Sequence, residues 1–129
     1  MENVIKNMNI RPMLDRAEFE RVEMPKNGES VNMQITDEVK VKLIADNVVN
    51  VSLARSALSN PERLFKLYVE MSADVLIDRK YYDELKDPVE YFKKSAICGI
   101  LVKQLVTLIA NLTSNSAIGP VISAPYVQA

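Results

Sequence analysis

Residues 96–112 of this 129-residue chain read AICGILVKQLVTLIANL, a run in which Lys103 is the only charged residue. No charged residue follows it as far as position 129. Apolar positions recur at intervals of three and four, which predicts a helix. The surface helix of a free monomer normally keeps a polar face, because that side meets water. We therefore expect this helix to be buried on two sides, which predicts assembly.

The same run is long enough to be considered as a membrane span. Lys103 and Gln104 stand at its middle, and a central lysine costs about 2.5–3.5 kcal/mol on insertion. Gly99, Ala110 and Asn111 do little to offset that cost. We therefore expect no membrane insertion and a helix that packs against protein.

Period-two alternation precedes the helix and predicts β-strands. Apolar residues occupy odd positions in 31–43, 49–53 and 65–77, with mostly polar residues between them. A break near Asp37 predicts a bend or bulge, and a further short strand is expected around Phe19. The short connections favour an antiparallel meander with one apolar face.

These patterns predict a single α+β domain, in which a four-stranded antiparallel sheet is followed by one long helix. Asp87 and Pro88 make a good helix start, with Asp as the cap and Pro in the first turn. The helical pattern runs on from Val89, and Pro120 cannot continue it. The expected parts are an N-terminal arm at 1–16, the sheet at 17–78, a helical region at 81–113 and an extended tail at 114–129.

Composition narrows the range of functions. Sixteen basic residues nearly balance 17 acidic ones, so no strong field recruits nucleic acid. The chain has no histidine, which removes the commonest general base and metal ligand. The acidic residues at 83, 84 and 87 are interpreted as caps and solvated turns. The sequence therefore predicts a protein that is not an enzyme, with no catalytic residue, metal or cofactor.

Cysteine usage and the first residues bear on the compartment. The single cysteine, Cys98, lies in the apolar helix and is expected to be a small buried hydrophobe. A disulfide framework is excluded, which fits a reducing cytosol. Residues 1–6 lack the basic start and continuous apolar core of a signal peptide. We therefore expect a cytoplasmic protein.

A short motif follows the helix. Residues 119–126 read GPVISAPY, and the helix itself follows an aromatic pair at 91–92. In these features the chain resembles the SecB family of bacterial export chaperones. In that family the first long helix likewise ends in a short loop, a proline, an apolar stretch and an Ala-Pro or Leu-Pro step. Pro120 matches the first proline, and Ala124 with Pro125 matches the second step.

The resemblance implies a homodimer or a homotetramer, the latter built as a dimer of dimers with long helices between two sheets. It also implies binding of unfolded or pre-secretory polypeptides in apolar grooves. Further partners consistent with it are the translocase motor or an antitoxin. Docking to the motor relies on an acidic surface in the family, whereas Lys40 and Glu70 typify the mixed signs here. A SecB-like chaperone outside the export route is equally expected.

Candidate residues follow from these expectations. Client contacts are predicted for Tyr68, Val121, Ile122 and Tyr126. An oligomer interface is predicted for Ile97, Leu101, Leu105, Leu108 and Ile109. The tail residues have an alternative interpretation, in which the tail packs on the sheet as core or interface. An alternative function also stays open, that of a small oligomeric structural or adaptor protein with one fixed partner.

Overall fold

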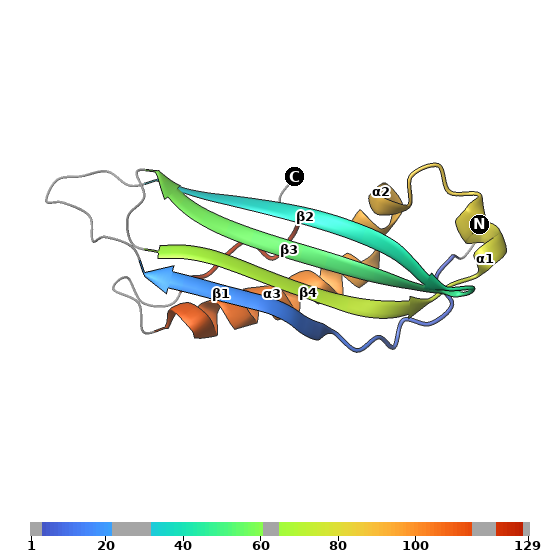
Figure 1. Cartoon of the computed structure of the whole chain (residues 1–129), viewed down its shortest axis with the longest axis horizontal. Coiled ribbons are helices and arrows are strands. Elements are labelled where there is room, and N and C mark those ends of the chain that lie inside the picture. The colour runs from blue at the N-terminus through green and yellow to red at the C-terminus, as the bar shows by residue number, and fades with distance from the viewer. Residues whose placement is uncertain (1–3, 22–31, 61–64, 115–120, 128–129) are drawn as a thin grey trace, which may run out of the picture.

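The computed structural model describes residues 4–21, 32–60, 65–114 and 121–127 (Figure 1). Its elements are β1 (Met13–Arg21), β2 (Asn32–Ala45), β3 (Val48–Asn60), β4 (Phe65–Leu76), α1 (Arg79–Asp83), α2 (Pro88–Lys93) and α3 (Ala96–Thr113). The strands form one antiparallel sheet, and α3 lies along one of its faces. The predicted α+β fold class is confirmed.

The strand order is β1-β4-β3-β2. Strands β2, β3 and β4 follow one another as in the predicted meander, but β1 pairs with β4, which makes the order a Greek key. The prediction of a simple meander was therefore wrong for β1. Its position has a physical reason, because Ala17 and Phe19 of β1 pair with Val69 and Leu67 of β4. This pairing removes an open edge beside a strand whose inner side chains are buried.

The N-terminal segment belongs to the sheet more fully than an arm would. Strand β1 begins at Met13, four residues before the expected start of the sheet. Further upstream, Ile5 makes an isolated antiparallel bridge with Ile77, and Lys6 N–H donates to the Leu76 carbonyl at 2.9 Å. Val4 and Ile5 are buried in the core, so the described part of the arm is packed.

Strand β2 runs through Asp37 without interruption, and the irregularity lies between Leu43 and Ala45. The bend predicted at Asp37 was therefore wrong. The extra residue at position 44 shifts the register by one, so that odd positions of β2 lie opposite odd positions of β3. Opposite residues share a face of the sheet. This bulge therefore places the apolar sets of both strands on the same side.

The long helix predicted from Val89 onward is two helices, because Ser95 starts a new one. Ser95 Oγ accepts from Ile97 N–H at 3.2 Å and donates to the Phe92 carbonyl at 2.7 Å. A serine cap of this kind competes with continuing the helix. The predicted start is confirmed, because the Asp87 side chain accepts from Glu90 N–H and caps α2.

Helix α3 and the inner face of the sheet enclose the core. Leu101 and Leu105 of α3 are fully buried with Val51 and Val69 of the strands. The opposite side of α3 carries a polar strip of exposed residues, namely Lys103, Gln104, Thr107 and Asn111. The expectation of a helix without a polar face was therefore too strong. Helix α3 is long and apolar enough to cross a membrane, but the core helix of a folded domain has the same length and composition.

Candidate functional site

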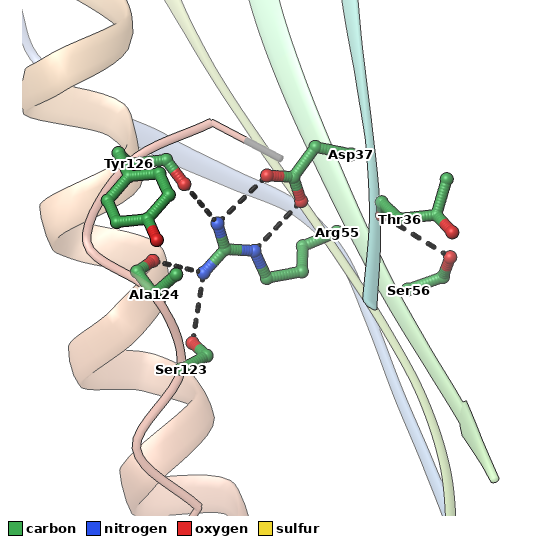
Figure 2. Close-up of polar contacts among 7 residues, drawn as sticks. All are labelled: Thr36, Asp37, Arg55, Ser56, Ser123, Ala124 and Tyr126. Atoms are coloured by element: carbon green, nitrogen blue, oxygen red, sulfur yellow. Dashed lines mark hydrogen bonds and ion pairs between the residues drawn. The ribbon is translucent and has the colours of Figure 1, made fainter. Parts of the chain in front are cut away.

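A buried ion pair lies on the inner face of the sheet. Arg55 of β3 and Asp37 of β2 are cross-strand partners, and both side chains are fully shielded from water. Arg55 Nε donates to Asp37 Oδ1 and Arg55 Nη2 donates to Asp37 Oδ2, each at 2.8 Å (Figure 2). This two-bond arrangement is the strongest geometry for a guanidinium and a carboxylate. It fixes the guanidinium plane relative to the strands.

The other donors of Arg55 hold a segment that follows α3 in the chain. We call residues 121–127 the bound segment; it runs alongside α3 and meets the guanidinium (Figure 2). Arg55 Nη1 donates to Ser123 Oγ at 2.9 Å and to the Ala124 carbonyl at 2.7 Å. Arg55 Nη2 donates to the Tyr126 carbonyl at 2.9 Å. With the two bonds to Asp37, all five N–H groups of the guanidinium have an acceptor.

Thr113 at the end of α3 anchors the start of the bound segment. Its buried hydroxyl donates to the Ile109 carbonyl and accepts from Val121 N–H, each at 2.7 Å. Val121 and Val127 then pack half-buried against the core. Ser123 is buried, whereas Ile122 and Tyr126 are 75% and 65% exposed. The segment thus turns some side chains inward and presents others to solvent.

The structure brings three of the four predicted client contacts together. Val121, Ile122 and Tyr126 all lie on the bound segment, while Tyr68 lies on the outer face of the sheet. There Tyr68 lines a groove of about 260 Å³ with Leu58 and residues of β1. Burial raises the pKa of the Tyr68 hydroxyl, and the negative charge of Glu70 raises it further. The Arg16 guanidinium lies 5.4 Å from the centre of the Tyr68 ring.

The structure describes two of the three motif residues, Ala124 and Pro125. The Ala124 carbonyl is one of the acceptors of Arg55, and Pro125 is exposed beside it. Pro120 lies outside the described residues. The second step of the motif thus coincides with the place where Arg55 holds the chain.

Four of the five residues predicted for an oligomer interface lie in the core of the single chain. Ile97, Leu101, Leu105 and Ile109 are at most 1% exposed, in the core against the chain's own sheet. Their helical stripe covers the inner strands, so it is not available to a second copy. Leu108 is half-buried and lines a groove of about 240 Å³ between α3 and β1.

Cys98 is the one thiol in the sequence. Cys98 is 1% exposed, and burial raises the pKa of its thiol to about 11. It is therefore protonated and unreactive at neutral pH. Among the described residues no three His, Cys, Asp or Glu side chains gather as metal ligands. The chemistry of the site is hydrogen bonding and apolar contact.

No family model and no curated protein matches the chain. Among solved structures, it is similar to the Mycobacterium tuberculosis SecB-like chaperone Rv1957 in complex with a ChAD peptide from the Rv1956 HigA1 antitoxin. The TM-score is 0.70 at 14% identity, over 90% of this chain and 88% of that chain. The fold is SecB-like. A Streptococcus agalactiae protein of unknown function matches with a TM-score of 0.44 at 13% identity, over 92% of this chain and 98% of that chain.

Within this SecB-like fold, Arg55 and Asp37 are functional residues that were not predicted from the sequence. Each stands at an odd position of an alternating strand, where the neighbouring odd residues are mostly apolar. The signal that could have found them is this shared parity, because two opposite charges on the apolar face of adjacent strands need each other. Their pairing turns three N–H groups of Arg55 toward the bound segment, and we call the space around Arg55 that this segment fills the cleft.

Proposed function

We propose that this protein is a SecB-like chaperone that holds unfolded or non-native polypeptides through apolar surfaces, without catalysis. The fold supports this, since a SecB-like chaperone of the same architecture was solved with a peptide bound. The observation that carries it is the way Arg55 holds the bound segment. Of the three hydrogen bonds that Arg55 donates to this segment, two are made to main-chain carbonyls. Bonds of this kind suit segments of many sequences.

Apolar groups on the surface supply further contacts for clients. Leu14 is 51% exposed and lines the groove between β1 and α3 with Met71 and Leu108. Leu58 is 48% exposed and lines the groove that contains Tyr68. Several shallow apolar sites on one molecule raise the effective concentration of a long chain at each of them. We propose these grooves, and the place that the bound segment occupies beside Arg55, as client contacts.

The proposed clients are unfolded or pre-secretory polypeptides in the cytoplasm. The peptide in the Rv1957 complex comes from an antitoxin, which favours an antitoxin over the translocase motor as a further partner. An adaptor that serves one fixed partner is the competing function. The two differ in breadth, because a chaperone protects unrelated proteins and an adaptor does not.

The test measures light scattering from several unrelated proteins during heat- or dilution-induced aggregation. Near-stoichiometric amounts of this protein should suppress the aggregation of all of them. Leu14→Lys, which places a charge in the proposed groove, should weaken protection. The matched control is Ile44→Lys, which changes an exposed residue at the bulge of β2 and should leave protection unchanged. Protection of none of the clients would refute the chaperone function.

We also propose that the protein assembles as a homodimer or homotetramer. With the buried stripe of α3 committed to the sheet, the outward side is the part of this helix that stays available to a second copy. Ile100, Val106 and Ala110 are half-buried there, beside the exposed Lys103. Small and branched apolar groups of this kind allow close approach of two helices.

A further inference from the structure

The cleft around Arg55 has the features of a site for an extended polypeptide. We infer that an extended segment of a non-native client binds in this cleft, in place of the bound segment that occupies it in the free protein. The inference rests on the chaperone function proposed above and gives that function a defined site.

The donors of Arg55 define what the cleft recognises. Asp37 takes two of the five N–H groups and holds the guanidinium in place, which leaves three for a ligand. These three meet one hydroxyl and two main-chain carbonyls spaced two residues apart, those of Ala124 and Tyr126. Every polypeptide carries such carbonyls. Because buried donors without acceptors are destabilising, the cleft requires an occupant but does not require one sequence.

The side chains of the bound segment show which positions of a ligand are restricted. Ser123 is 6% exposed, so this position admits a small residue. Val121 and Val127 are half-buried, so the positions two before and four after it favour apolar residues. Ile122 and Tyr126 are largely exposed, and their positions are open. A pattern of this breadth recurs in most unfolded chains, which is what a general chaperone needs.

The bound segment is attached in a way that permits replacement. In the ranges that the structure describes, residues 121–127 make no hydrogen bond to another main-chain group. When a client replaces the segment, the hydrogen bond from Val121 N–H to Thr113 is lost. The three hydrogen bonds that Arg55 donates to the segment are remade with the client. Beside the segment lies a cavity of about 410 Å³, lined by residues of α2 and α3. A Cβ added to Gly99 in that wall would meet nothing within 4 Å, so the cavity has room for client side chains.

The first experiment measures the affinity of a fluorescein-labelled peptide with the sequence of residues 121–127. The wild-type chain is compared with Val121→Lys, which removes a half-buried anchor, and with the neighbouring Ile122→Lys, which changes an exposed residue. Releasing the internal segment raises the fraction of open cleft, and the apparent affinity rises with that fraction. We expect Val121→Lys to bind the peptide at least about ten-fold more tightly than the other two proteins. Equal affinities for all three folded proteins would overturn the inference.

The second experiment asks whether clients use the same cleft. Reduced, carboxymethylated α-lactalbumin, which stays unfolded, should displace the labelled peptide from Val121→Lys. A peptide with Tyr in place of Ser123 should bind at least about ten-fold more weakly, because the buried position admits only a small residue. Peptide binding that α-lactalbumin does not displace would overturn the inference and leave a cleft that accepts only this segment, from its own chain or from a second copy.

Hydrogen exchange on the wild-type chain tests the inference even if Val121→Lys fails to fold. The Val121 amide is bonded to Thr113 Oγ1 and should exchange faster when α-lactalbumin is bound. A Val121 amide that stays protected in the complex would refute replacement. Clients that are protected from aggregation while Val121 stays protected would leave the chaperone function intact and remove only the site. Faster exchange of the Val121 amide without protection of clients from aggregation would support the site and refute the chaperone function.

Discussion

Arg55 and Asp37 face each other across β3 and β2 with both side chains shielded from water, and their two hydrogen bonds are 2.8 Å long. Burying two charges has a large desolvation cost, which their attraction offsets only when the geometry is good and every other donor is satisfied. Here the remaining donors are satisfied by Ser123, Ala124 and Tyr126. The ion pair therefore depends on an occupant of the cleft, and the occupant depends on the ion pair.

Arg55→Ala should be strongly destabilising. It removes the guanidinium that pairs with the buried Asp37 carboxylate, a change that costs about 3–5 kcal/mol in comparable sites. Urea denaturation followed by circular dichroism measures the loss. The control is Arg16→Ala, because Arg16 pairs with Glu18 at the surface and exposed pairs contribute little. A loss no larger than that of the control would contradict the buried-pair interpretation.

Replacing both partners separates the ion pair from the seat of the bound segment. With Asp37→Leu and Arg55→Leu together, no charge is left unpaired, so the free energy of unfolding should lie closer to wild type than in Arg55→Ala. The Val121 amide should nevertheless exchange faster, since the bonds that hold the segment are gone. A double variant as unstable as Arg55→Ala would show that the segment, and not the charge balance, dominates the loss.

The core of the molecule was largely predictable, and its polar centre was not. Alternation located β2 and β4 because their apolar residues keep one parity over many positions. The same rule misread Asp37 as a break and gave no role to Arg55, because both are charged residues at positions where the pattern expects apolar ones. Only the register shift at the bulge places the two violations opposite each other. Likewise, the helical period identified the stripe containing Leu105, but it could not assign that stripe to the chain's own sheet.

Leu105→Ala tests where that stripe lies. Leu105 is fully buried in the core of the single chain, so the substitution should cost about 2–5 kcal/mol of unfolding free energy. The loss should be independent of protein concentration, because the contact is internal. Leu112→Ala serves as the control, since Leu112 is 37% exposed near the end of the same helix, and its loss should be smaller. A loss for Leu105→Ala that appears only on dilution would return the residue to an oligomer interface.

Ile100→Glu tests the proposed assembly surface. Ile100 lies on the outward side of α3 and is half-buried in the single chain. A carboxylate there should reduce the mass measured by multi-angle light scattering to that of the 14.5 kDa chain, while circular dichroism stays unchanged. Lys86→Glu, an exposed change outside the helices, should keep the oligomer. A wild-type chain that is a folded monomer at micromolar concentration would remove the assembly proposal.

Cys98 links stability to alkaline pH. Burial raises the pKa of its thiol from 9.0 to about 11 in the folded chain. Below pH 9.0 the thiol is protonated in both states, and its contribution to stability is fully present. Between these two pKa values the unfolded chain loses the proton first, so the contribution declines as pH rises toward 11.

Urea midpoints measured near pH 8 and near pH 10 should therefore differ more for the wild-type chain than for Cys98→Ala. The comparison between the two proteins removes the effect of lysines and tyrosines, which titrate in both. In the native wild-type chain, iodoacetamide should modify Cys98 much more slowly than in urea, because the side chain is 1% exposed. Equal pH slopes together with rapid native alkylation would mean that the thiol is not buried beneath the sheet.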